Sequence, residues 1–129
     1  MRAMLAAAMV GGAAWYSTAR AQDARLPELT AEGFAEAHQR NSYATEADLN
    51  GKTFRFTGVP MAVTRGADGL PRVTYAVPAA PWRVQAQIAK EAEGMAAKIA
   101  PGEPLALVCT GAADGMLFPF VTGCRAAKP

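Results

Sequence analysis

The chain has 129 residues, which allows one domain of moderate size, and 51% of them are hydrophobic. It carries 13 lysines and arginines against 11 aspartates and glutamates. Two of the basic residues, Arg2 and Arg20, belong to the leader segment described next, so the remaining chain has 11 basic and 11 acidic residues. A neutral domain lacks the basic excess that binding to a phosphate backbone normally exploits, and this composition argues against general nucleic-acid binding.

Residues 1–21 have the pattern of a secretory signal peptide. Arg2 supplies a positive charge, residues 3–15 are apolar, and residues 19–21 match the small-x-small pattern of a signal-peptidase site. We therefore predict cleavage after Ala21 and export to the periplasm or the outside of a bacterial cell. The alternative is an uncleaved membrane anchor, for which the apolar run is short beside the roughly 20 residues of a spanning helix.

The chain after the leader is predicted to form a lead-in over residues 22–29 and a single domain over residues 30–129. Thr30 stands where a helix N-cap is wanted, and the acidic residues that follow suit the first turns of a helix. We therefore predict a helix over residues 31–40. Residues 42–49 continue either as a second helical segment or as an irregular connection.

Five strands are predicted downstream, mainly from apolar residues that recur at every second position. In the first, over residues 52–64, Phe54 and Phe56 should face the interior, and Gly58 suggests a bulge or a sharp bend. Residues 90–99 have the composition of a helix, which separates the third strand from the fourth. The other four strands are expected at residues 72–77, 82–88, 105–109 and 116–122.

Three strands, a helix and two further strands is the element order of the five-stranded OB-fold barrel. We therefore predict a mainly β protein with two helices, in which a five-stranded OB-fold barrel is preceded by an N-terminal helix. An open α+β sheet with helices on one face is the alternative that the same pattern allows.

The two cysteines are Cys109 and Cys124, and both lie after the leader. In an exported chain an even cysteine count favours a disulfide over two free buried thiols. Both cysteines are in phase with the apolar residues of the last two predicted strands, so a hairpin that turns near Gly115 would bring them together. With a single histidine they cannot complete a four-ligand zinc site without carboxylates, and we predict neither a metal site nor a cofactor.

The sequence contains no convincing catalytic pattern. His38 is the only histidine, and beside Glu36 and Arg40 on the first helix it is expected to be a surface residue. Ser42 is the only serine after the leader, and no second base accompanies it, which argues against a serine hydrolase triad. We therefore predict that the protein is not an enzyme.

A spaced set of asparagine, glycine and apolar positions extends from about Thr30 to Cys124. Its members are Asn41, Ala44, Asp48, Leu49, Gly51, Lys52, Phe54, Phe56, Thr57, Gly58, Gly102, Cys109, Gly111 and Cys124. This set resembles the tRNA-anti-like OB-fold family of exported bacterial proteins. The resemblance implies an OB barrel of largely undefined activity, and the family name records a fold relationship to tRNA-anticodon-binding domains. The chain departs from the family pattern at residues 78–81, between the second and third strands.

OB barrels bind oligonucleotides or oligosaccharides across their second and third strands. There the chain offers Arg72, Tyr75 and Arg83 as candidate ligand contacts, whereas Trp82 shares its phase with the apolar residues of the third strand. The predicted function is an exported OB-fold binding or interaction module whose ligand or envelope partner is unknown. The alternatives are nucleic-acid or oligosaccharide binding through these two strands, and a structural protein of the cell envelope.

Overall fold

The computed structural model describes residues 22–78 and 82–128, so the predicted signal peptide and its cleavage site lie outside the described residues. Its helices are α3 (Ala31–Arg40), α4 (Ser42–Leu49) and the 3-10 helix η1 (Lys90–Lys98), and residues 22–25 are also helical. Its strands are β1 (Glu28–Thr30), β2 (Phe54–Gly58), β3 (Pro60–Arg65), β4 (Pro71–Ala76), β5 (Arg83–Ile88), β6 (Leu105–Cys109), β7 (Gly111–Ala113) and β8 (Phe120–Ala126). Across the part of the chain that is described, no helix has the length and apolar character needed to cross a membrane.

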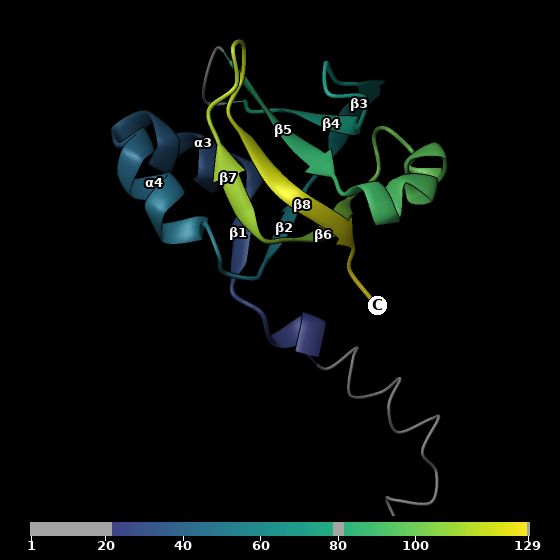
Figure 1. Cartoon of the computed structure of the whole chain (residues 1–129), viewed down its shortest axis with the longest axis horizontal. Coiled ribbons are helices and arrows are strands. Elements are labelled where there is room, and N and C mark those ends of the chain that lie inside the picture. Colours follow the sequence, from purple (N-terminus) through teal and green to yellow (C-terminus); the bar gives the residue numbers. More distant parts are fainter. Residues whose placement is uncertain (1–21, 79–81, 129) are drawn as a thin grey trace, which may run out of the picture.

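All eight strands belong to one sheet (Figure 1). Its hydrogen-bonded path runs β1-β2-β6-β8-β5-β4-β3, and β7 pairs with β8 beside this path. Most neighbouring strands are antiparallel, but β1 pairs with β2 and β5 pairs with β8 in parallel. The path therefore has two ends, β1 and β3. Val59 alone separates β2 from β3 in the chain. β3 lies at one end of the path and β2 lies second from the other end, so a continuous segment of chain links one end of the path to the strand beside the other end.

The predicted closed barrel of five strands and two helices is only partly confirmed, since the described chain is mainly β but its sheet has eight strands and an open hydrogen-bonded path. The strand expected over residues 52–64 is divided in two because Pro60 has no N–H to donate to a ladder, and the register shifts between Pro60 and Ala62. The strand expected over residues 116–122 begins only at Phe120, and the separate short strand β7 precedes it.

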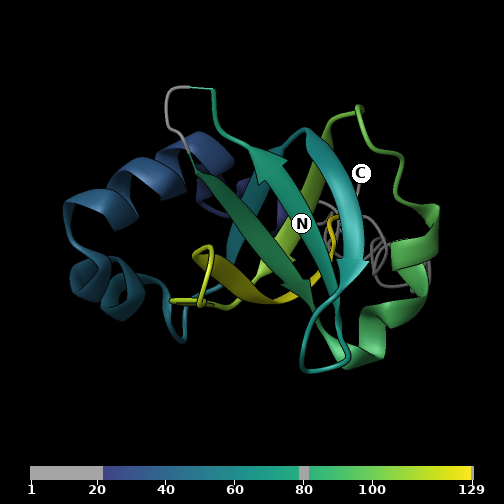
Figure 2. The ribbon, with the colours of Figure 1, turned by 90° about the horizontal axis from the view of Figure 1, so that it is seen from above.

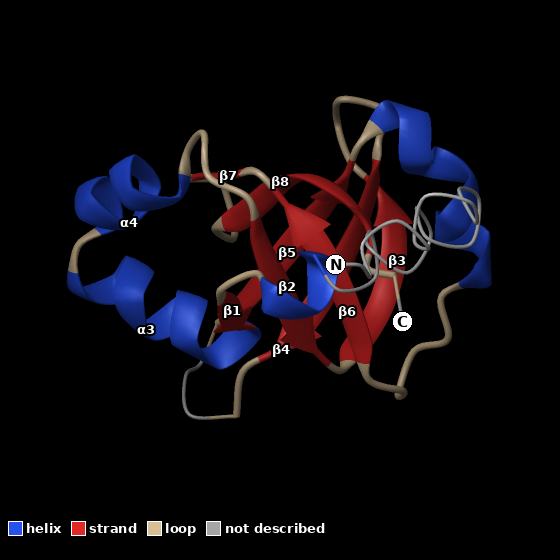
Figure 3. Ribbon diagram, turned by 90° about the horizontal axis from the view of Figure 1, so that it is seen from below, coloured by secondary structure: helices blue, strands red, loops and turns tan. Residues whose placement is uncertain are grey.

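The helices lie on two sides of the curled sheet. Figure 2 and Figure 3 show α3 and α4 on one side and η1 on the other. Helix α3 has its predicted bounds, and its predicted cap is confirmed because Thr30 Oγ1 accepts a hydrogen bond from the Gly33 N–H at 2.9 Å. Asn41 ends α3 and caps α4, its side-chain oxygen accepting from the Ala44 N–H at 3.0 Å. The helical alternative for residues 42–49 is therefore correct.

The core lies inside the curled sheet and under α3. Phe54 and Phe56 are 3% and 0% exposed, which confirms that both rings face the interior. Phe34 of α3 meets Phe56 edge to face at 6.0 Å between ring centroids, and Phe56 meets Tyr75 of β4 in the same way at 5.3 Å. This row of rings joins α3, β2 and β4, so it fixes the helix against the sheet.

A disulfide joins Cys109, at the end of β6, to Cys124 in β8, as predicted. The register explains the pairing: Leu107 lies opposite Ala126 and Val108 lies opposite Arg125, so the next residue of β6 faces Cys124 across the antiparallel ladder. Both cysteines are fully buried. The covalent bond therefore ties two neighbouring strands within the core.

Candidate functional site

The outer face of β4 and β5 carries a row of polar side chains. The two strands are antiparallel, with Arg72 opposite Gln87 and Thr74 opposite Gln85, and side chains two residues apart share a face. β4 ends before Pro78, and the rest of the predicted break, residues 79–81, lies outside the described residues. The strands thus present one polar surface on the side away from the core.

Arg72 is the centre of this surface. Its guanidinium carbon lies 4.0 Å from the centroid of the Phe120 ring, which is contributed by β8. Nη1 donates to Gln85 Oε1 at 3.4 Å, and Nη2 donates to Asp68 Oδ2 at 3.2 Å. Because stacking and two hydrogen bonds hold the guanidinium flat, it forms a rigid planar element of the surface.

Asp68 connects the β3–β4 loop to the same network. Its Oδ1 accepts from the Leu70 N–H at 2.9 Å, and its Oδ2 accepts from Gln87 Nε2 at 2.6 Å. The Leu70 N–H, followed by the Gln87 amide and the Arg72 guanidinium, holds the pKa of Asp68 below its usual value. Asp68 is therefore an anion at neutral pH that positions Arg72 and partly neutralises it.

The structure separates the three predicted ligand residues. Tyr75 is fully buried against Phe56, so it does not reach the surface that carries Arg72. Strand geometry gives the reason, because residues three apart point to opposite faces of a sheet. Arg83 is exposed on the same outer face, but it lies opposite Ala76, about 13 Å along the ladder from Arg72.

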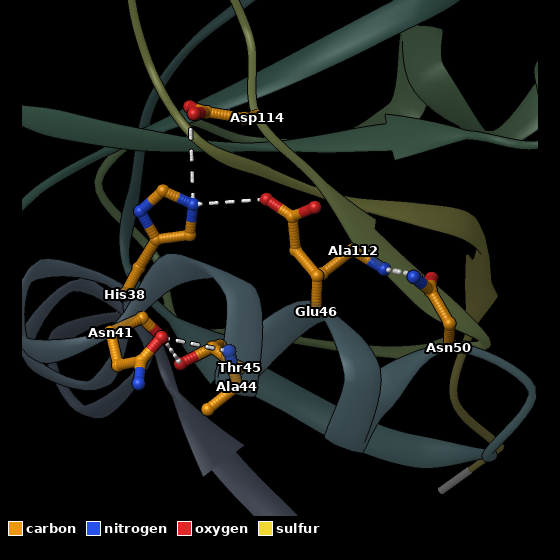
Figure 4. Close-up of polar contacts among 8 residues, drawn as sticks. All are labelled: His38, Asn41, Ala44, Thr45, Glu46, Asn50, Ala112 and Asp114. Atoms are coloured by element: carbon orange, nitrogen blue, oxygen red, sulfur yellow. Dashed lines mark hydrogen bonds and ion pairs between the residues drawn. The ribbon is translucent and has the colours of Figure 1, made fainter.

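Three side chains able to ligate a metal or transfer a proton converge where α3, α4 and the loop after β7 meet (Figure 4). His38 Nε2 of α3 lies 3.3 Å from Glu46 Oε2 of α4 and 3.9 Å from Asp114 Oδ1, which follows β7. His38, which was predicted to be a surface residue, is partly buried, with its side chain 12% exposed. α3 and the folded-back α4 shield the ring, an arrangement that the helix pattern alone does not reveal.

Two asparagines position this cluster. Asn41 forms the sharp turn that folds α4 back beside α3, and Figure 4 shows its side chain at the start of α4. Asn50 follows α4, and its Oδ1 accepts from the Ala112 N–H of β7 at 2.9 Å. The same connection includes a backbone hydrogen bond from Gly51 to Thr110 at 3.1 Å. The helix pair is therefore held in register with the strand that leads to Asp114.

A pocket of about 300 Å³ opens beside the cluster. Its lining includes His38, Asp114, Ser42, Trp82 and Pro119. Trp82 is partly buried and packs against the core at this point, outside the strand in which it was expected. The pocket gives small molecules access to the imidazole and to one of the two carboxylates. Sequence reasoning missed this site because its members belong to three elements that only the folded chain brings together.

Comparisons with known proteins bear on the fold. No protein-family model and no curated protein matches the chain, so the resemblance to the tRNA-anti-like family stays a prediction. Among solved structures, the chain is similar to a "putative nucleic acid-binding lipoprotein" from Klebsiella pneumoniae, with a TM-score of 0.65 and 16% sequence identity. The match covers 81% of this chain and 94% of the other. The two proteins therefore share a fold.

Proposed function

We propose that the protein is an exported binding module with an OB-type fold, and that it belongs with the tRNA-anti-like proteins it resembles. When β2 and β3 are counted as two halves of one bent strand, the path β2-β6-β8-β5-β4-β3 returns to its start. That order, with its parallel β5–β8 pairing, is consistent with a partly open OB barrel. The leader pattern, the disulfide and the likeness to a lipoprotein support export to the periplasm or beyond.

The observation that carries a binding function is the stacking of Arg72 on Phe120 within the polar face of β4 and β5. In OB folds this face and its flanking loops receive the ligand. The Arg72 side chain is 15% exposed, and this exposed part of the stacked guanidinium is where a planar group would meet it. Binding, with no chemical conversion, is the activity that this arrangement supports.

Single-stranded nucleic acid is the ligand class that best suits this surface, because its bases stack on planar groups without sequence preference. The name of the Klebsiella lipoprotein agrees with this choice. Arg72 and Arg83 are the basic residues of β4 and β5, both lie on the outer face, and Asp68 partly neutralises Arg72. We therefore propose weak binding dominated by stacking. A plot of the logarithm of the binding constant against the logarithm of the salt concentration should have a slope no steeper than about −1.4, the value for two phosphate contacts to a single strand.

The test is fluorescence anisotropy with labelled single-stranded oligonucleotides of about 12 nucleotides, a length that spans one OB-fold site. Arg72→Gln should weaken binding about tenfold, within the range given by one lost stacking partner. Lys98→Gln removes one exposed cation from η1 and is the charge-matched control. Tyr75→Phe is the second control, since a buried hydroxyl does not meet a ligand.

Three results would contradict the proposal: no binding at low salt, equal binding by the Arg72→Gln and Lys98→Gln variants, or a steep salt dependence. Binding of an oligosaccharide that is lost in Arg72→Gln would keep the surface but replace the ligand class.

A second candidate, an envelope interaction protein, is favoured by the β7–β8 loop. Met116 and Leu117 are adjacent there and almost completely exposed, although both are large and apolar. Exposed apolar side chains side by side are typical of contact points with other proteins. Retention of a partner from an envelope extract that resists nuclease treatment and is lost in a Met116→Ser, Leu117→Ser variant would support this candidate over nucleic-acid binding.

A further inference from the structure

His38, Glu46 and Asp114 form a set of metal-ligating atoms outside the proposed binding surface. Their nearest donor atoms, one imidazole nitrogen and two carboxylate oxygens, all lie within 4.8 Å of one another. They come from α3, α4 and the β7–β8 loop, and Figure 4 shows the imidazole Nε2 directed toward both carboxylates. We propose that this cluster binds a first-row divalent transition metal such as Zn²⁺.

The spacing of the donor atoms suits such an ion. Zinc bonds to nitrogen and oxygen are about 2.1 Å long. At the tetrahedral angle, two such ligand atoms are therefore about 3.4 Å apart. His38 Nε2 and Glu46 Oε2 are 3.3 Å apart, and Asp114 Oδ1 lies 3.9 Å from the same nitrogen. The Asp114 side chain is 63% exposed on a loop, so a small movement of this side chain would complete the contact.

The charges of the cluster also favour a cation. In the described chain, neither Glu46 nor Asp114 makes an ion pair except with His38. In a neutral imidazole, Nε2 carries at most one N–H, which cannot donate a good hydrogen bond to both carboxylates. Even a protonated ring, with one positive charge, leaves the cluster with a net charge of about −1. A divalent cation would bind the deprotonated Nε2 and neutralise both carboxylates.

The surroundings provide both shielding and access. The side chains of His38 and Glu46 are 12% and 28% exposed, so the ligands are already partly removed from water before a metal arrives. The neighbouring pocket of about 300 Å³ leaves room for water molecules to fill the remaining coordination positions. The imidazole selects zinc, copper, nickel or cobalt over calcium and magnesium, which prefer oxygen ligands throughout.

Bound metal would link the helix pair α3–α4 to the loop after β7. The hydrogen bond between Asn50 and Ala112 already joins these elements, so the site needs little reorganisation when the ion enters. We expect the metal to raise the melting temperature, since an ion that binds only the folded chain stabilises it.

The experiment is isothermal titration calorimetry, in which Zn²⁺ is added to the protein prepared without an affinity tag. The visible absorption spectrum of bound Co²⁺ is recorded as a second measurement. One ion should bind per chain in the presence of excess Mg²⁺. His38→Gln and Asp114→Asn should each weaken binding by at least about tenfold, the smallest loss expected when a metal site is disturbed. Asp48→Asn is the matched control, because Asp48 is an exposed carboxylate on α4 that pairs with Lys52.

Circular dichroism should be used to check that each variant is folded, and Asp114→Asn changes only an exposed loop side chain. Absence of stoichiometric Zn²⁺ binding, or binding that survives in both His38→Gln and Asp114→Asn, would overturn the proposal. The proposal would also be overturned if the original chain bound no Zn²⁺ while His38→Gln was less stable, because the cluster would then be an ion pair that needs no metal. Arg72→Gln should bind Zn²⁺ normally, so this site and the proposed nucleic-acid surface stand or fall separately.

Discussion

Asp23 and Arg125 join the two ends of the described chain through a two-pronged ion pair. Arg125 Nη1 donates to Asp23 Oδ2 and Nη2 donates to Oδ1, each at 3.1 Å, although the residues are 102 positions apart. The Lys128 N–H donates to the same carboxylate at 2.9 Å. Asp23 is one of two buried polar residues among those described. The lead-in before β1 is therefore fixed to the strand that closes the domain.

This ion pair predicts an acid-sensitive part of the stability. The side-chain hydrogen bonds from Arg125, with the Lys128 N–H, hold the pKa of Asp23 below its ordinary value of 3.8. A carboxyl whose pKa is lowered by folding stabilises the protein above the unfolded pKa and loses this effect as the pH falls through the folded pKa. The contribution should thus be complete at neutral pH and fall progressively as the pH drops below 3.8 through the lower folded-state pKa.

The variant Asp23→Asn tests this acid-sensitive contribution, since the amide keeps the shape of the carboxylate but loses its charge. We expect the free energy of unfolding at neutral pH to fall by about 1 to 3 kcal/mol, the usual value of hydrogen bonds to a charged group. In urea unfolding over a pH series, the free energy of unfolding of Asp23→Asn should fall less on acidification than that of the original chain. Glu103→Gln, an exposed carboxylate, is the control. Equal acid sensitivity of Asp23→Asn and the original chain would contradict the prediction.

The disulfide predicts that thiol titration of the denatured, unreduced protein finds no free cysteine. Cys109 and Cys124 are 15 residues apart, and closing a loop of this size stabilises the folded state by about 3 kcal/mol in the chain-entropy model. Reduction should therefore lower the midpoint of urea unfolding by a corresponding amount. Two titratable thiols, or an unchanged midpoint after complete reduction, would show that the bond is absent or without effect.

Gly58 ends β2 where the rings of the core pass close to the backbone. A methyl carbon added there would lie 2.9 Å from Tyr75 Cδ2 and 3.2 Å from Ala31 Cβ, whereas one added at Gly94 would meet nothing within 4 Å. Gly58→Ala should therefore cost about 1 to 3 kcal/mol, as overpacking does, and Gly94→Ala should cost nothing. Comparison of the two melting curves checks this, and equal curves would mean that the core absorbs the methyl group freely.

Close packing against Tyr75, and not left-handed backbone, is thus what requires a glycine at position 58, since its φ is not positive. The sequence indicated an irregularity at this residue. The strand breaks one residue later, at Val59, where Pro60 removes a ladder donor. The break and its cause at Pro60 were therefore predictable from the sequence, whereas the need for glycine at position 58 depends on Tyr75 of β4.

Local signals determined several elements fully. Helix α3 has its predicted bounds because the Thr30 cap and the turn at Asn41 act within a few residues. β6 also has its predicted bounds, Leu105–Cys109, because it is a short apolar run between Pro104 and the polar Thr110. By contrast, β1 has only three residues and pairs with a strand far along the chain, so its own sequence carries no comparable signal.

By itself, the sequence determined part of the core and several of the turns, because periodicity and capping are properties of neighbouring residues. That was enough to place Phe54, Phe56 and the two cysteines in the interior. Only the tertiary structure decided which polar groups meet, as His38 does with Asp114 and Asp23 with Arg125. Such pairs depend on how the sheet curls, since its curvature brings together side chains that no local pattern relates.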